Sequence, residues 1–168
     1  KKYLDLIAES KVYDVAENTP MTFASNLSSK LKNEVFLKRE DMQPIFSFKI
    51  RGAYNKIANL SKQQQKRGVL TASAGNHAQG VANACKKLKI PCFIVMPVTT
   101  PEIKVKSVRR FGSKVLLHGD NFDQASKKAI QMAKEKKLEF IEAFDDPMTI
   151  AGQGTVGKEI FEEDNKLD

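Results

Sequence analysis

The sequence has little of what builds a disulfide scaffold, a metal site or a membrane anchor. Its 168 residues include two cysteines and two histidines. Cys85 and Cys92 are too few for a disulfide framework, and with only His77 and His118 beside them a structural zinc site is not expected. The longest apolar run, residues 92–98, contains a proline and is far shorter than the roughly 20 residues that a membrane-spanning helix requires. We therefore expect a cytoplasmic protein with reduced thiols, no metal and no membrane partner.

The sequence also lacks the kind of basic patch that binds nucleic acid. There are 28 lysines and arginines against 20 acidic residues, a formal net charge of +8. The excess is mostly lysine, in pairs such as Lys86–Lys87 and Lys136–Lys137 that fall on the expected solvent faces of helices. The sequence contains no arginine-rich stretch with interleaved aromatic residues. Nucleic acid is therefore not an expected partner, and a hydrophobic content of 41% is typical of a globular protein with a buried core.

From residue 34 onward, short β-rich runs alternate with helical periodicity. The runs that we expect to be strands are residues 35–37, 68–71, 92–96, 115–117 and 140–141. The apolar spacing between them predicts helices that begin near residues 47, 75, 100, 121 and 147. Strands that alternate with helices across short loops form βαβ units. The sequence therefore predicts an α/β fold, an open parallel sheet of about four strands with helices on both faces.

Polar residues and a proline mark where several of these helices should begin. Ser47 is expected to cap the first helix. Thr100 is expected to cap the third, with Pro101 at its first helical position. Asn121, with Gln124 three residues later, resembles a capping box. These assignments place the helix starts at named residues.

Lys49 is the first candidate for chemistry. It lies at the second position of a predicted helix, where the macrodipole disfavours its charge, and it follows Phe48, which can desolvate it. Both effects lower the pKa of the amine, which a lysine that forms a Schiff base requires. From spacing alone, an ordinary solvated lysine remains the simpler interpretation.

The turn Ser73-Ala74-Gly75-Asn76-His77 is the second candidate. Small residues between a buried strand and a helix N-terminus expose backbone N–H groups, which can bind a carboxylate or phosphate. The alternative is an ordinary tight turn in which Ser73 or Asn76 caps the helix. The side chain of His77 is expected to be packed or hydrogen-bonded rather than to serve as a ligand or base.

Residues 152–157, GQGTVG, formally satisfy the pattern G-x-G-x-x-G of dinucleotide-binding proteins. That fingerprint requires a strand directly before it and an acidic residue at the end of a second strand. Residues 145–147, Asp-Asp-Pro, separate the pattern from the last expected strand. We therefore expect the pattern to be coincidental, and its glycines to let a helix pack closely against another backbone.

Three runs together resemble one enzyme family. Residues 38–54, KREDMQPIFSFKIRGAY, are similar to the segment that carries the cofactor lysine in threonine dehydratases, which are pyridoxal-phosphate enzymes of the tryptophan-synthase-β-like fold. Residues 73–82, SAGNHAQGVA, resemble the family's substrate loop, and residues 144–155 also match. The first run looks more like the biosynthetic, isoleucine-pathway members than the catabolic ones.

The resemblance implies roles for the residues that match. Lys49 would bind pyridoxal 5′-phosphate covalently and act as the catalytic base, with Phe48 beside the cofactor ring and Asn76 at its 3′-oxygen. Backbone N–H groups of residues 73–77 would hold the carboxylate of the amino-acid substrate. The implied reaction is the deamination of L-threonine to 2-oxobutanoate and ammonia, the first step of isoleucine biosynthesis. The alternatives are a serine dehydratase or racemase of the same kind, or a non-catalytic nucleotide- or small-ligand-binding domain.

The resemblance also implies a division of the chain. Residues 1–45 would belong to the N-terminal part of a large cofactor-binding domain, residues 46–146 would form a small α/β domain, and residues 147–168 would return to the large domain. The family's glycine-rich phosphate-binding loop and its isoleucine-sensing allosteric domain are not among these residues. We therefore expect a homo-oligomeric parent enzyme, dimer or tetramer, and no threonine turnover by the 168 residues alone.

Overall fold

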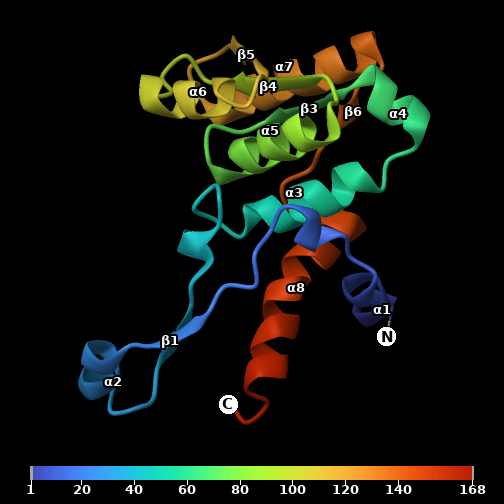
Figure 1. Cartoon of the computed structure of the whole chain (residues 1–168). Helices are drawn as coiled ribbons and strands as arrows, with labels where there is room; N and C mark the ends of the chain where they lie inside the picture. The colour runs from blue at the N-terminus through green and yellow to red at the C-terminus, as the bar shows by residue number, and fades with distance from the viewer. Residues whose placement is uncertain (1, 168) are drawn as a thin grey trace.

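A four-stranded parallel sheet forms the centre of the molecule. The computed structural model describes residues 2–167. The strands are β3 (Val69–Ala72), β4 (Cys92–Met96), β5 (Lys114–Leu117) and β6 (Glu139–Phe140), in the order β5-β4-β3-β6. All three pairings are parallel, so the predicted sheet is confirmed (Figure 1). Central strand β3 is buried at every position, as expected when both faces of a parallel sheet are covered.

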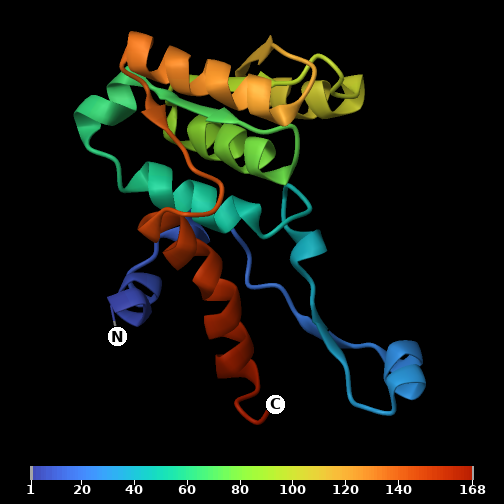
Figure 2. The same cartoon turned by 180° about the vertical axis from the view of Figure 1, so that it is seen from behind.

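Helices cover both faces of this sheet. α7 (Phe122–Lys136) packs on one face, where Ala125, Ala129 and Met132 meet Leu70 and Val95. α5 (Asn76–Leu88) and α6 (Glu102–Arg109) cover the other face, with apolar positions at helical spacing turned toward the strands (Figures 1 and 2). A short helix that the sequence did not predict, α4 (Lys62–Arg67), leads into β3. Its six residues are all polar, so they carry no apolar periodicity.

α3 (Lys49–Ala58) lies between α5 and α8 (Pro147–Glu163), and glycines let all three helices approach closely. A Cβ atom at Gly80 of α5 would lie 2.8 Å from the carbonyl oxygen of Lys49. One at Gly152 of α8 would lie 2.6 Å from the Cα atom of Gly52. Residues 152–157 are therefore the interior of a packed helix with no strand directly before them, and the structure confirms that the dinucleotide pattern is coincidental.

The N-terminal segment packs against α8 and α3 at its start and then projects away from the sheet as an arm at residues 21–38 (Figure 1). Its elements are α1 (Lys2–Ala8), η1 (Val12–Asp14), β1 (Met21–Phe23), α2 (Ser25–Leu31), β2 (Phe36–Lys38) and η2 (Glu40–Met42). β1 and β2 pair antiparallel, so the strand predicted at residues 35–37 exists one residue later, in a small sheet of its own. The division of the chain at residues 45 and 146 remains a prediction. None of the helices within residues 2–167 has the length and apolar character that crossing a bilayer requires.

Two predicted helix caps are wrong. α3 begins at Lys49 with Phe48 as its N-cap, and Ser47 lies one residue too early, although its Oγ accepts a hydrogen bond from the Lys49 N–H at 3.2 Å. α6 begins at Glu102, because the backbone of Pro101 is extended (ψ 138°) and Pro101 itself is the N-cap. The Thr100 hydroxyl is then left buried without a hydrogen-bond partner.

The starts of α7 and α8 lie where the sequence predicted them. The Asn121 side chain accepts a hydrogen bond from the Gln124 N–H at 3.0 Å, which confirms the cap of α7. The predicted capping box is incomplete, because the Gln124 side chain accepts from Asp120 N–H rather than from Asn121. α8 begins with Pro147 at its first turn, and Asp146 caps it.

Candidate active site

A cavity of about 320 Å³ opens at the carboxyl ends of β3 and β6. From β3 the chain runs outward to β4 and β5, and it then returns to the other side of β3 as β6. This reversal of strand order is the place where open α/β sheets bind ligands. Five of the predicted site residues line the cavity, namely Phe48, Lys49, Ser73, Asn76 and His77. The fold therefore brings two runs of sequence, near residues 48 and 75, to one crevice.

Lys49 contributes the amine of this cavity. Its Nζ donates a hydrogen bond to the carbonyl oxygen of Ala143 at 3.1 Å and lies 4.4 Å from the ring centre of Phe144 and 5.2 Å from that of Phe48. Burial lowers the pKa of Lys49. The sequence predicted Lys49 at the second position of this helix, but Lys49 is the first residue of α3. A half-buried amine with a lowered pKa is a better nucleophile than a solvated one.

The turn of residues 73–77 leads directly into α5. Gly75 is the N-cap of α5, and no side chain within the described residues caps this helix, so the alternative in which Ser73 or Asn76 does so is wrong. The Ser73 Oγ instead accepts from the Gly75 N–H at 3.2 Å. Ala74 packs against the core, and nothing lies within 4 Å of where a Cβ on Gly75 would be. Ala74 and Gly75 do not line the cavity. The first-turn N–H groups of α5 nevertheless remain available to an anion.

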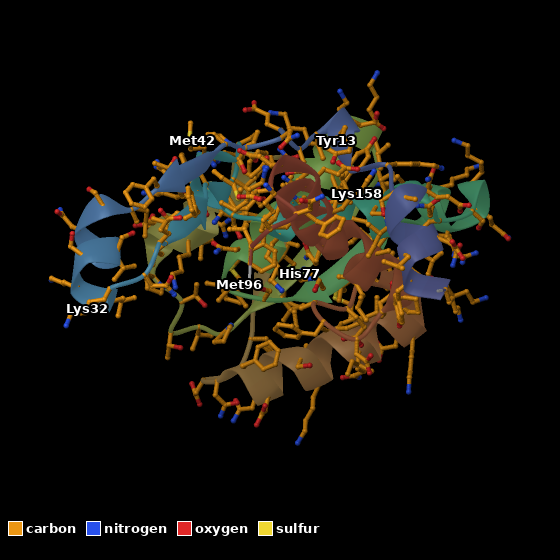
Figure 3. The ribbon with its side chains drawn as sticks, turned by 90° about the horizontal axis from the view of Figure 1, so that it is seen from below. Tyr13, Lys32, Met42, His77, Met96 and Lys158 are labelled. Carbon is orange, nitrogen blue, oxygen red and sulfur yellow. The ribbon has the colours of Figure 1, made fainter. Side chains whose placement is uncertain are left out.

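His77 lies near the middle of the molecule, where Figure 3 labels it. It is 4% exposed, and its Nε2 lies 3.1 Å from the carbonyl oxygen of Ile141. Burial, with a smaller contribution from the charge of Lys49, lowers the pKa of His77 to about 4, so the ring is neutral at pH 7. Since a carbonyl can only accept, Nε2 carries the proton and Nδ1 has a free lone pair, for which the structure shows no partner.

Five lining residues were not predicted as part of the site, namely Ser47, Ala72, Phe122, Ala143 and Phe144. Phe122, the first residue of α7, is 55% exposed and lines the cavity. Ala143 and Phe144 follow β6 and contact the Lys49 amine, as described above. Because the carboxyl ends of neighbouring parallel strands meet at one edge, the residues after the strand at 140–141 could have been placed beside those after 68–71.

Known proteins similar to this chain are threonine dehydratases. The biosynthetic L-threonine dehydratase of Pasteurella multocida is 53% identical over 167 residues, which cover 99% of this chain and 33% of that protein. The threonine dehydratase of Nicotiana attenuata is 55% identical over 159 residues, 95% of this chain and 26% of that protein. The chain thus spans about a quarter to a third of the length of the curated relatives it matches.

Solved structures of a threonine deaminase and of a serine racemase have the same fold. The processed form of threonine deaminase isoform 2 from Solanum lycopersicum superposes with a TM-score of 0.93 at 49% identity, over 96% of this chain and 45% of that one. Maize serine racemase also gives a TM-score of 0.93, at 32% identity, over 98% of this chain and 50% of that one. The model of the family described as "Pyridoxal-phosphate dependent enzyme" matches residues 12–168. With Lys49 in a crevice at the switch point of the sheet, and with this match over nearly its whole length, the chain belongs to the pyridoxal-phosphate dependent enzymes.

Proposed function

We propose that the protein to which this chain belongs deaminates L-threonine to 2-oxobutanoate and ammonia, as the first step of isoleucine biosynthesis. The observation that carries the proposal is the half-buried amine of Lys49, whose pKa is lowered, in a cavity next to the exposed first turn of α5. Identity of 53% to a biosynthetic threonine dehydratase over nearly the whole chain supports the choice of substrate.

The residues of the cavity fit pyridoxal 5′-phosphate and an amino acid. One amine, Lys49, can bond to an aldehyde, the ring of Phe48 can lie against an aromatic ring, and the amide of Asn76 can hydrogen-bond a phenolic oxygen. When bound, this cofactor supplies an electron sink that makes the Cα–H bond of an amino acid acidic. Residues outside this chain would contribute to holding its phosphate.

The roles of the chain's own residues follow from their positions. The N–H groups at the start of α5, within residues 73–77, would hold the substrate carboxylate and fix the orientation of the Cα–H bond. The amine of Lys49 would accept the Cα proton as a neutral base. A lowered pKa favours this, because a larger fraction of the amine is unprotonated at pH 7. The neutral His77 adds no second charge to the cavity.

The net reaction balances without another reactant. Threonine loses its β-hydroxyl and the Cα proton as one water, and one water is consumed when the nitrogen leaves as ammonia. The oxidation level of the molecule as a whole is unchanged, so no oxidant or reductant is required.

Two measurements test the proposal. Borohydride reduction in the presence of pyridoxal phosphate, followed by peptide mapping of the protein expressed from its complete gene, should label Lys49 in preference to the many surface lysines. The same protein should release 2-oxobutanoate from L-threonine. Label spread evenly over the lysines would contradict the proposal. Faster turnover of L-serine, or formation of D-serine, would instead support the serine dehydratase or racemase alternative.

Several finer features belong to the same proposal. We expect a homo-oligomer, cytoplasmic localisation, and a small domain at residues 46–146 between two contributions to a larger one. We also expect that residues 1–168 expressed alone do not turn over threonine, since the curated relatives are three to four times as long as the matched part. Production of 2-oxobutanoate by the isolated 168 residues, abolished by Lys49→Ala, would contradict this last point.

A further inference from the structure

A buried ion network lies on the side of α3 that faces away from the cavity. Arg51, in the first turn of α3, has no solvent exposure. Its guanidinium forms two parallel hydrogen bonds to Glu40 of η2, from Nε to Oε2 at 2.9 Å and from Nη2 to Oε1 at 2.8 Å. The same guanidinium pairs with both carboxylate oxygens of Glu159 on α8. Arg51 therefore joins the start of α3 to two elements at once.

Further contacts complete the network and balance its charge. The Nη1 of Arg51 donates to the Thr155 hydroxyl at 3.1 Å, and Nη2 donates to the carbonyl oxygen of Glu17 at 3.0 Å. The Nζ of Lys38, also buried, lies 3.1 Å from Glu159, and the Tyr13 hydroxyl donates to Glu159 at 2.8 Å. Figure 3 shows Tyr13 close to α8, which carries the labelled Lys158. Two cations thus face two carboxylates, drawn from the N-terminal segment, α3 and α8.

The position of Arg51 on its helix relates this network to Lys49. Residues two apart on an α-helix point about 200° from one another, so the two side chains leave α3 on opposite sides. Between them the backbone is held on both flanks by the Gly80 and Gly152 contacts. The Gln153 side chain of α8 also accepts a hydrogen bond from the Gly52 N–H at 3.1 Å. The first turn of α3 therefore has fixed neighbours on every side except the cavity.

We propose that Arg51 is a positioning residue for the reaction, and that its pairing with Glu40 and Glu159 sets where the Lys49 amine stands in the cavity. The inference rests on the proposed function, because it concerns how Lys49 meets the cofactor. A reacting group displaced by about 1 Å can lose on the order of 100-fold in rate. A guanidinium held by two carboxylates restricts the helix turn in a way that a flexible lysine at position 51 does not.

The test compares Arg51→Lys and Glu159→Gln with Met132→Ala, in the protein expressed from its complete gene. Met132 is on the buried side of α7, which packs on the opposite face of the sheet, so its variant loses core packing without touching α3. The readout is the rate at which pyridoxal phosphate and borohydride label Lys49, followed by mass spectrometry across pH. Among the cavity-lining residues, His77 on α5 is the only other titrating group, and β3, α7 and the loop before α8 contribute none.

We expect Arg51→Lys and Glu159→Gln to label Lys49 at least about tenfold more slowly at pH 7, with the profile moved to higher pH as the amine becomes more exposed. Met132→Ala should keep the rate and profile of the wild type although it unfolds at a lower temperature. Wild-type rates and profiles in both network variants would overturn the inference.

Two further outcomes are also decisive. If Arg51→Lys does not fold, Glu159→Gln decides, because its amide keeps the size of the side chain and one acceptor oxygen. If neither network variant folds while Met132→Ala does, the network is purely structural and the inference is wrong. Label spread evenly over all lysines of the wild type would contradict the proposed function itself. The wild type is therefore measured before any variant is compared with it.

Discussion

Lys49 and Arg51 lie two residues apart in the first turn of α3, and their charges meet opposite surroundings. Around Lys49 are a carbonyl oxygen and two aromatic rings, with no ion pair to a carboxylate within residues 2–167, and burial lowers its pKa. Around Arg51 are two carboxylates. Burial again opposes the charge, but the hydrogen bonds to Glu40 and Glu159 outweigh it, so the pKa of Arg51 rises.

The comparison distinguishes Arg51, a cation that stabilises the structure, from Lys49, a cation suited to a chemical reaction. Both side chains have been moved out of water, which is costly for any charge. On the side of α3 that faces α8, ion pairs offset the cost of burying the charge, and the hydrogen bonds from Arg51 lower the pKa of Glu40. Burial and the hydrogen bond to Glu159 raise the pKa of Tyr13 to about 12. On the cavity side the cost of burying the charge is not offset by an ion pair, so the amine of Lys49 gives up its proton more easily. One helical turn therefore presents a fixed charge and a reactive amine back to back.

The largest expected effect follows from removing the reactive amine. Lys49→Ala should lower kcat for threonine by at least about 100-fold, since it removes both the covalent attachment and the base. Lys49→Arg should be equally inactive, because a guanidinium stays protonated. The free energy of unfolding should not fall in either variant, as no ion pair is broken. Lys66→Ala, on the exposed face of α4, is the control, and substantial turnover by Lys49→Arg would contradict the assignment.

Removing the structural cation should instead act on stability. Arg51→Met leaves the carboxylates of Glu40 and Glu159 buried without their partner, which costs about 3–5 kcal/mol in the free energy of unfolding. For a chain of this size, that corresponds to a fall of roughly 10 °C in Tm. Urea and thermal unfolding measure it, with the exposed pair Glu102–Lys106 broken in Lys106→Ala as the matched control. If Arg51→Met loses no more free energy of unfolding than Lys106→Ala, the view that Arg51 stabilises the structure is wrong.

The neutral histidine of the cavity side predicts a pH dependence. The pKa of His77 is about 4 in the folded protein, against about 6.5 when unfolded. Below pH 6.5 the unfolded state therefore binds more protons, and the free energy of unfolding decreases as the pH falls from about 6.5 to about 4. At pH 5 the loss relative to pH 7 is about 2 kcal/mol. His77→Gln should lose this slope and His118→Gln should keep it, and equal slopes in the two variants would show that another group is responsible.

The smallest effect distinguishes two glycines of α8. An alanine at position 152 places a Cβ 2.6 Å from the Gly52 Cα and 2.8 Å from the Arg51 carbonyl oxygen, whereas at Gly157 nothing lies within 4 Å. Both substitutions raise helix propensity, so the difference between their free energies of unfolding reports the steric crowding at position 152. This crowding costs about 1–3 kcal/mol. Denaturant unfolding should show Gly157→Ala more stable than the wild type and Gly152→Ala less stable than Gly157→Ala. Equal stability of the two variants would mean that α3 and α8 can move apart.

The sequence predicted the sheet and most of its helices because each depends on local pattern. The continuous apolar run at residues 92–96 is what a strand covered on both faces requires, and the Asn121 cap follows from short-range hydrogen bonding. The starts of α3 and α6 were each misplaced by one or two residues. Ser47 lies one residue before the N-cap of α3, and Thr100 lies one residue before the N-cap of α6, because the backbone of Pro101 is not yet helical. β1 and β2 were not predicted as a pair, since each has only three residues, too few to establish a period-two pattern.

The site was predictable only as far as motifs extend. Residues 48–49 and 73–77 stand in recognisable runs, and five of these residues line one cavity. Arg51 carried no signal of its own, because a single arginine among 28 basic residues is typical of a solvated surface. Its partner Glu159 lies 108 residues further along the chain, and no spacing rule connects them. The roles of the individual cavity residues remain predictions.

The glycine contacts that flank the first turn of α3 also decide when its conformational entropy is lost. Because Gly80 and Gly152 allow neighbouring backbones to hold the turn from both sides, the φ and ψ angles at Lys49 become restricted as the chain folds. A ligand that arrives later has only the rotamers of the lysine side chain and of rings such as Phe144 left to order. Association is then opposed by a smaller entropy loss than it would be at a mobile loop. The crevice is thus preorganised at its backbone and adaptable at its rim.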